Sequence, residues 1–164
     1  MASSKNTFDH ELQQETHERV GRFLSELFES PHLDPENAHY YVLYGSTVLE
    51  ISVEPYGPED TTVQVTAYCV QGVEPNEELA LGLLQLNQQL PIGAFSIVGE
   101  DVYYSHTLLG RSLDRKNLLG TIAAVADASD EYDDRIVEKY GGQRALDRIR
   151  DTGGRQKRLE GLSN

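Results

Sequence analysis

Three aspartates in the second half of the chain have the spacing best suited to chemistry. Asp127, Asp130 and Asp134 lie about one turn apart if this segment is helical, so their carboxylates share one face. Such a face binds a divalent cation weakly. The same run does not match the pattern of a calcium-binding loop, because Tyr132 occupies the position where that loop requires glycine. We favour the interpretation that these aspartates form a solvated helix face. The alternative is a small divalent-metal-dependent enzyme or factor that uses them.

The other candidates for catalysis stand apart from one another. Cys69 alternates with inward-facing apolar residues, which predicts a small core residue instead of a nucleophile. His10 and His17 lie two turns apart on a predicted helix, too distant to share one metal ion directly. His106 has no partnered nucleophile motif. An enzyme needs its acid, base or nucleophile brought together, so we predict no catalytic residue, no metal site and no cofactor.

The charge of the chain is strongly negative and unevenly spread. Its 164 residues carry a net charge of −13, which divides into −16 over residues 1–143 and +3 over residues 144–164. An acidic body repels phosphate backbones and anionic membranes, so we expect neither nucleic acid nor a membrane as partner. A carboxylate-rich surface suits a high-salt cytoplasm, although we favour an ordinary solvated surface. Residues 1–6 lack the apolar core of a signal peptide, which favours the cytoplasm.

The apolar pattern predicts a single α+β domain over residues 1–150. Amphipathic periodicity predicts helices over residues 7–28 and 76–90, and a third from near Ser112 or Asp114 to about residue 140; Asn6 or Thr7 caps the first, and the third is broken around residues 127–130. A short helix is expected over residues 143–150, and a disordered basic tail over 151–164.

Alternating apolar residues predict about five strands between these helices. Three strands, at residues 39–44, 47–54 and 61–70, follow a polar connector at 31–37, and a hairpin turns at Gly99 and Glu100. The order α-βββ-α-ββ-α predicts an antiparallel sheet that helices cover on one face.

Two segments of the second half resemble a known family. Residues 86–97 read LNQQLPIGAFSI, residues 102–110 read VYYSHTLLG, and the long helix after them ends in YDD and YGG. This pattern resembles the YbjN-like proteins, which share the fold of type III secretion chaperones. The resemblance implies small acidic dimers that hold a partner polypeptide along hydrophobic patches of the sheet and first helix. It implies no catalytic residue, and the arginine-rich segment 144–158 departs from it.

The strands carry more tyrosines and aliphatic residues than one buried face can hold. Because side chains alternate along a strand, about half of them point away from the helices. Tyrosine suits interfaces, since it offers apolar area with a polar tip. We therefore predict a non-catalytic peptide- or protein-binding module, chaperone-like or regulatory, that forms a homodimer. The alternatives are a surface that loops or the tail cover, and a structural subunit of an assembly. The predicted partner-binding residues are Tyr41, Leu43, Val48, Tyr68 and Tyr103.

Overall fold

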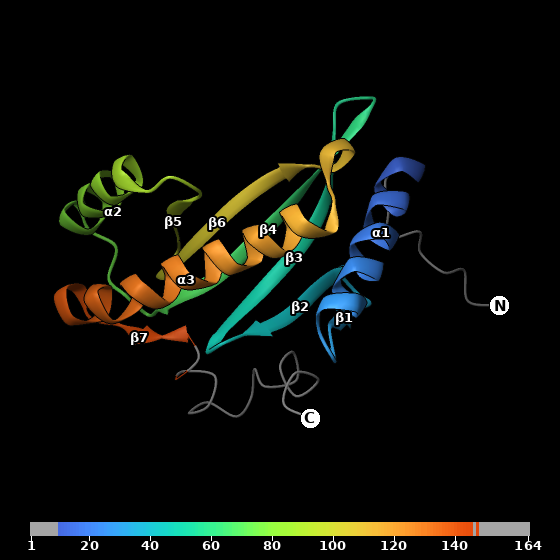
Figure 1. Ribbon diagram of the computed structural model, residues 1–164. Helices are drawn as coiled ribbons and strands as arrows, with labels where there is room; N and C mark the ends of the chain where they lie inside the picture. The colour runs from blue at the N-terminus through green and yellow to red at the C-terminus, as the bar shows by residue number, and fades with distance from the viewer. Residues whose placement is uncertain (1–9, 146, 148–164) are drawn as a thin grey trace.

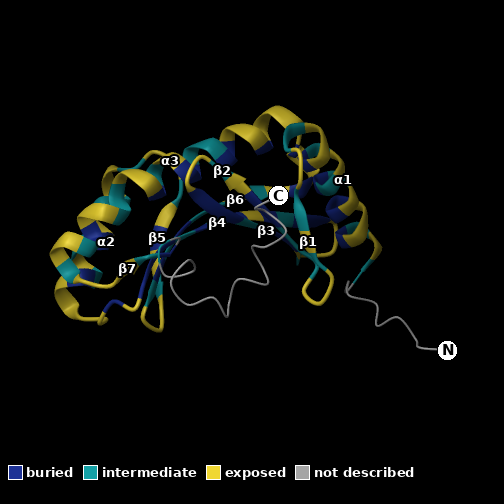
Figure 2. Cartoon of the chain, turned by 90° about the horizontal axis from the view of Figure 1, so that it is seen from below, coloured by how far each residue is buried: buried dark blue, intermediate teal, exposed yellow. Residues whose placement is uncertain are grey.

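A single antiparallel sheet with helices on one side forms the body of the protein (Figures 1 and 2). The computed structural model describes residues 10–145 and 147. The strand order is β1-β2-β3-β4-β6-β5, and β7 pairs with the end of β4. The strands are β1 (His32–Asp34), β2 (His39–Tyr44), β3 (Thr47–Tyr56), β4 (Asp60–Gln71), β5 (Ala94–Val98), β6 (Asp101–Leu109) and β7 (Gln143–Arg144). The predicted α+β class, with helices over one face, is confirmed.

Side chains cap the three helices at their first turns. The helices are α1 (Glu11–Leu27), α2 (Glu77–Gln89) and α3 (Arg115–Tyr140), with the 3-10 turn η1 (Gly110–Ser112) before α3. Asn76 and Asp114 cap α2 and α3, close to the predicted starts. At α1 the cap is His10, whose Nδ1 accepts from the Gln13 N–H at 3.1 Å. The predicted caps Asn6 and Thr7 lie outside the described residues.

The predicted break in the third helix is wrong, because α3 runs without interruption from Arg115 to Tyr140. Val125, Ala126 and Ser129 are all buried, so the apolar stripe continues through the acidic segment. Asp127 and Asp130 are exposed and do not interrupt the packing. A run of acidic residues on the solvated face therefore does not end a helix whose opposite face is still buried.

The strand count is higher than predicted because two very short strands complete the sheet. The expected connector at residues 31–37 contains β1, where Leu33 pairs with Tyr40. The helix expected from residue 143 instead begins with β7, where Arg144 pairs with Val70. Strands of two or three residues have no alternation of their own, and the edge of a neighbouring strand determines where they pair. Residues 148–164, which include the predicted tail, lie outside the described residues.

The helix-covered face of the sheet holds the hydrophobic core. Cys69 belongs to it, as predicted, and burial raises the pKa of its thiol to about 12. A thiol that stays protonated at neutral pH is a poor nucleophile. Each large apolar side chain buried here contributes roughly 1.5–3 kcal/mol to folding. The core includes Val20 and Leu24 of α1, Leu49, Ile51 and Val53 of β3, Val63 and Val65 of β4, and Leu118, Ile122 and Val125 of α3.

A close backbone approach joins α1, β4 and η1 at one end of the sheet. A Cβ added to Gly110 would lie 1.9 Å from Thr61 Oγ1, so only glycine fits there. The hydroxyl of Thr61 in turn donates to Thr16 Oγ1 of α1 at 3.0 Å, and both threonines are buried. This junction determines how far η1 lies from the N-terminal half of α1.

Candidate polypeptide-binding face

The five predicted partner-binding residues all lie on the sheet face opposite the helices. Tyr41 pairs across strands with Glu50, Leu43 pairs with Val48, and Tyr68 pairs with Tyr103. Directly opposite residues of an antiparallel pair share one face of the sheet. Their core-facing neighbours, such as Leu49 and Ile51, point to the other side. The register thus gathers the five residues from β2, β3, β4 and β6, and we name this surface the helix-free face.

The Glu50 carboxylate organises the centre of the helix-free face. Its Oε2 accepts from the hydroxyl of Tyr41 at 2.6 Å and from that of Tyr68 at 2.5 Å. Its Oε1 lies 3.2 Å from Nδ1 of His39. The ring of Tyr103 meets that of Tyr68 edge to face, with centroids 5.2 Å apart. One carboxylate therefore orients two tyrosine rings, and Tyr68 positions a third.

The Tyr68 hydroxyl of this cluster is a hydrogen-bond donor and not an acid. Burial, reinforced by the hydrogen bond to Glu50, raises the pKa of Tyr68 above its ordinary value. The hydroxyl therefore keeps its proton at neutral pH and remains a hydrogen-bond donor to Glu50. The arrangement suits a rigid surface with aromatic rings at its centre, which is the kind of surface that proteins use for recognition.

Exposure differs among the five predicted residues. Leu43 is 42 % exposed, and Tyr68 and Tyr103 are partly exposed. Tyr41 and Val48 are only 2 % and 7 % exposed, so the expectation that they contribute open apolar surface is corrected. Tyr41 lies between β1 and β3 with its hydroxyl held by Glu50, and Val48 lines a small cavity with Ala145. A partner would thus reach Leu43, Tyr68 and Tyr103.

Sequence reasoning missed Glu50 and His39 as members of this cluster. Glu50 alternates with Leu49 and Ile51, which places it on the opposite face but says nothing about its neighbours. The signal that finds it is the β2–β3 register, which follows from the two-residue turn at Gly45 and Ser46. Counting back from that turn places Tyr41 opposite Glu50.

The aspartates proposed as a metal site lie on the exposed side of α3. Asp130 accepts from the hydroxyl of Ser46 at 2.7 Å, and Asp134 lies 3.7 Å from Nε of Arg144. Within residues 10–145 and 147, no three histidine, cysteine, aspartate or glutamate side chains are grouped as a metal ion requires. The structure therefore does not bring Asp127, Asp130 and Asp134 together as ligands.

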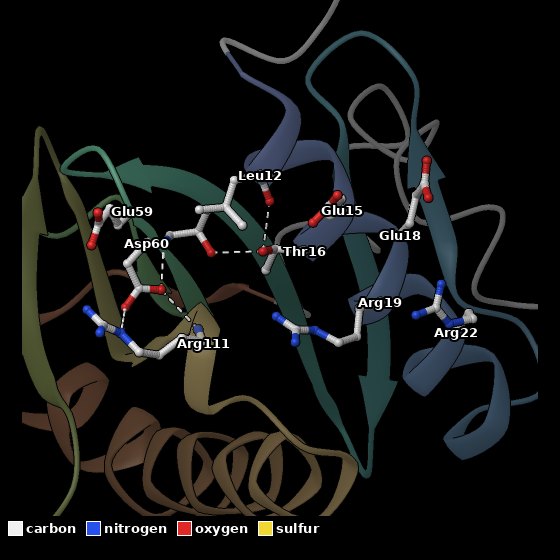
Figure 3. A pocket seen from close by; sticks show the side chains of 10 residues that line it. Leu12, Glu15, Thr16, Glu18, Arg19, Arg22, Glu59, Asp60 and Arg111 are labelled. Carbon is white, nitrogen blue, oxygen red and sulfur yellow. Dashed lines mark hydrogen bonds and ion pairs between the residues drawn. The ribbon is translucent and has the colours of Figure 1, made fainter.

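A second feature is the cleft between α1 and η1, which opens beside the Gly110 junction (Figure 3). Its volume is about 370 Å³. Asp60, 3 % exposed, forms its floor and accepts from the backbone N–H groups of Thr61 and Arg111 at 2.8 and 2.9 Å. The same carboxylate pairs with Arg111 Nε at 2.5 Å. This pairing with Arg111 holds the pKa of Asp60 below its usual value.

A comparison with known protein families shows which family this chain belongs to. The family model described as "T3SS (YopN, CesT) and YbjN peptide-binding chaperone 1", TY-Chap1, matches residues 14–148. The chain belongs to this family. The resemblance inferred from the LNQQLPIGAFSI and VYYSHTLLG segments is confirmed. No curated protein matches the chain.

Two solved structures share the fold of this TY-Chap1 chain. The crystal structure of the ExsC–ExsE complex aligns with a TM-score of 0.58 and 15% identity, and covers 76% of this chain and 95% of the other. An uncharacterized protein from Methanothermobacter thermautotrophicus aligns with a TM-score of 0.56 and 17% identity, over 77% of this chain and 99% of the other. At these identities the likeness shows the fold. In the described part of the chain, no helix has the length and apolarity needed to cross a membrane.

Proposed function

We propose that this protein binds a segment of another polypeptide on the helix-free face, as a non-catalytic, chaperone-like or regulatory module of the cytoplasm. The observation that carries the proposal is the cluster around Glu50, which presents Tyr68 and Tyr103 beside the exposed Leu43. The peptide-binding description of the matched family supports it. So does the ExsC–ExsE complex, in which a protein of the same fold is paired with a second protein.

The geometry of the face suits an extended or helical peptide of mixed character. Aromatic rings fixed by hydrogen bonds lose little conformational entropy when a partner packs on them. Leu43 and the ring edges supply apolar contact, while the edges of β1 and β5 leave backbone groups unpaired within the sheet. Rigid aromatic contact surrounded by polar groups is the usual composition of a protein interface.

We further propose that the protein acts as a homodimer through the α2–β5 side. Of the nine large exposed hydrophobic residues in the part of the chain that the structure describes, four belong to residues 81–98, namely Leu81, Leu84, Ile92 and Val98. Leu81 and Leu84 lie one turn apart on α2, so they share one face of that helix. An exposed apolar group of this kind favours association with a second copy. The dimer would leave the helix-free face open to the client.

The client-binding proposal is tested with peptides selected on the protein itself. A displayed random-peptide library is panned on the wild-type chain, and the affinity of enriched peptides is measured by fluorescence anisotropy. Leu43→Lys should weaken binding by about tenfold or more, since it places a charge in a desolvated contact. The matched control is Leu119→Lys on α3, where the leucine is 37% exposed but lies on the helical side. Equal loss in both variants, or no enriched peptide, contradicts the proposal.

The dimer proposal is tested separately by sedimentation velocity. The wild-type chain should sediment as a dimer at micromolar concentration, and Leu84→Glu should sediment as a monomer. Leu84 is 63% exposed, so its substitution leaves the core of the subunit intact. Leu119→Glu serves as the control and should remain a dimer. A wild-type protein that is monomeric at every concentration rules out the dimer but leaves the client-binding proposal standing.

A further inference from the structure

The cleft between α1 and η1 collects basic side chains in a chain that has few of them. Residues 1–143 carry eight lysines and arginines, and three of these, Arg19, Arg22 and Arg111, line this one cleft. In the view of Figure 3 their side chains form a row along the lower part of the cleft, with Glu15, Glu18 and Glu59 above it. Four carboxylates line the cleft as well, so the cleft is close to neutral within a body of charge −16 and repels an anion less than the rest of the surface does.

Arg19 has an unsatisfied donor at this cleft. Its Nη2 donates to the carbonyl of Gly110 at 2.6 Å, which fixes the guanidinium against η1. Its Nε–H is shielded from solvent and has no hydrogen-bond partner. A shielded donor without an acceptor costs free energy. Because this N–H is shielded, the donors open to an oxyanion are the remaining N–H groups of the partly exposed Arg19 guanidinium.

The neighbouring arginines differ from each other in how they are held. Arg111 is aligned by the buried Asp60, which accepts from its Nε, while the Arg111 side chain as a whole is 65% exposed. Arg22, one turn after Arg19 on α1, is exposed. Among the described residues, neither Arg19 nor Arg22 has a carboxylate within 4.0 Å. Two cations of the row therefore form no direct ion pair with the residues that the structure describes.

We propose that this cleft binds a carboxylate group, presented by an aspartate or glutamate side chain of the polypeptide partner, with Arg19 as the principal ligand and Arg22 and Arg111 as supporting cations. This inference rests on the proposed polypeptide-binding function and adds a second point of recognition to it. Four carboxylates line the cleft beside the three arginines, so a singly charged ligand suits it better than a doubly charged phosphate. A planar carboxylate also matches the planar guanidinium, with two parallel hydrogen bonds.

The experiment uses the full chain and a minimal probe. N-acetylglutamate amide is titrated into the ¹⁵N-labelled protein, and the arginine Nε–Hε resonances are followed by NMR. We expect a saturable shift of the Arg19 resonance, and no shift with N-acetylglutamine amide, the uncharged twin of the probe. Arg19→Gln, followed at the Arg111 Nε–Hε resonance, should weaken binding about tenfold or more. Arg22→Gln, at an exposed position that leaves folding intact, should weaken it a few-fold.

Arg135→Gln on α3 is the matched control, because it removes one positive charge outside the cleft and should leave the titration unchanged. The inference fails if the Arg19 shift does not saturate, if Arg135→Gln weakens binding as much as Arg22→Gln, or if the uncharged twin shifts the same resonance. Tighter binding of inorganic phosphate than of the carboxylate probe at equal ionic strength also overturns it. Such failures leave the proposed function intact, because that function is tested at Leu43 with selected peptides.

Discussion

The two faces of the sheet are stabilised by different kinds of interaction. Along β3 alone, Leu49, Ile51 and Val53 enter the core, whereas Glu50 and Ser52, on the opposite face, are polar. The covered face is held by apolar contact with α1 and α3. The helix-free face is held by hydrogen bonds that converge on Glu50. Alternate residues of the same strand therefore serve stability on one side and surface geometry on the other.

We expect substitutions on the covered face to lower the stability of the fold, and substitutions on the helix-free face to weaken the proposed partner binding. Burial is non-directional, so the covered face tolerates no loss of volume but needs no fixed orientation of polar groups. Hydrogen bonds are directional, so the helix-free face depends on a few atoms and is otherwise open to change. The predictions below test this division, starting with the largest expected effect.

The largest effect is expected from truncating the core side of β3. Ile51→Ala should lower the free energy of unfolding by about 2–5 kcal/mol. Ile51 is 0% exposed, and the neighbouring side chains can only partly close the cavity that the substitution leaves. Leu43→Ala, on the neighbouring strand but on the helix-free face, should change the free energy of unfolding by less than about 1 kcal/mol. Urea denaturation of both variants measures the contrast. Similar losses in the two would break the proposed division between the faces.

The covered side should be equally intolerant of added volume. Gly110→Ala should destabilise the fold by about 1–3 kcal/mol, because its Cβ meets the buried Thr61 hydroxyl and forces η1 away from α1. Gly120→Ala on α3 is the control, since a Cβ there meets no atom within 4 Å. That change should stabilise the protein by about 0.5–1 kcal/mol through helix propensity. Thermal denaturation of the two variants measures this difference. A Gly110→Ala variant more stable than the wild type would contradict the close contact between η1 and α1.

A smaller effect is expected where hydrogen bonds replace burial. Glu50→Gln should cost about 1–2 kcal/mol, because a neutral amide oxygen is a weaker acceptor than the charged Oε2 to which Tyr41 and Tyr68 both donate. Glu54→Gln, further along the same strand and exposed, should cost almost nothing. Unfolding curves, together with the near-ultraviolet circular dichroism of the tyrosines, provide the measurement. Unchanged tyrosine signals in Glu50→Gln would show that Glu50 does not orient the rings.

The smallest effect concerns the junction of the two faces, where Asp133 lines a cavity with Val48, Tyr68 and Cys69. Burial raises the pKa of Asp133 from 3.8 to about 6. A folded-state pKa above the unfolded value means that the ionised group destabilises the fold at neutral pH, and that protonation between about pH 6 and 4 relieves this cost. Because the group is partly exposed, Asp133→Asn should stabilise the protein by at most about 1 kcal/mol at pH 7.

The pH dependence checks the sign of this last effect. The advantage of Asp133→Asn over wild type should shrink as the pH falls from about 6 and should vanish below about pH 4. Asp127→Asn, at an exposed position of the same helix, is the control for the removal of one negative charge. An advantage of Asp133→Asn that grows toward low pH would contradict the buried-carboxylate explanation.

Most of the fold follows from local patterns in the chain. The alternation in residues 47–54 and 61–70 and the leucines of residues 76–90 predict β3, β4 and α2, because a half-buried element repeats its apolar residues at its own period. The two short strands β1 and β7 do not follow in this way, since two or three residues contain no period. The break expected in α3 fails because burial of Ser129 and its neighbours outweighs a local run of charge.

The candidate sites also contain some features that local sequence patterns predict and others that depend on the folded chain. Strand alternation, a local property, is enough to predict that five residues share the side away from the helices: Tyr41, Leu43, Val48, Tyr68 and Tyr103. Only the tertiary structure decided that Tyr41 and Val48 are buried, that Glu50 joins the tyrosines, and that Arg19, Arg22 and Arg111 meet in one cleft. Those facts depend on strand register and on η1 lying beside α1, and residues 91 positions apart, such as Arg19 and Gly110, meet only after the whole chain has folded.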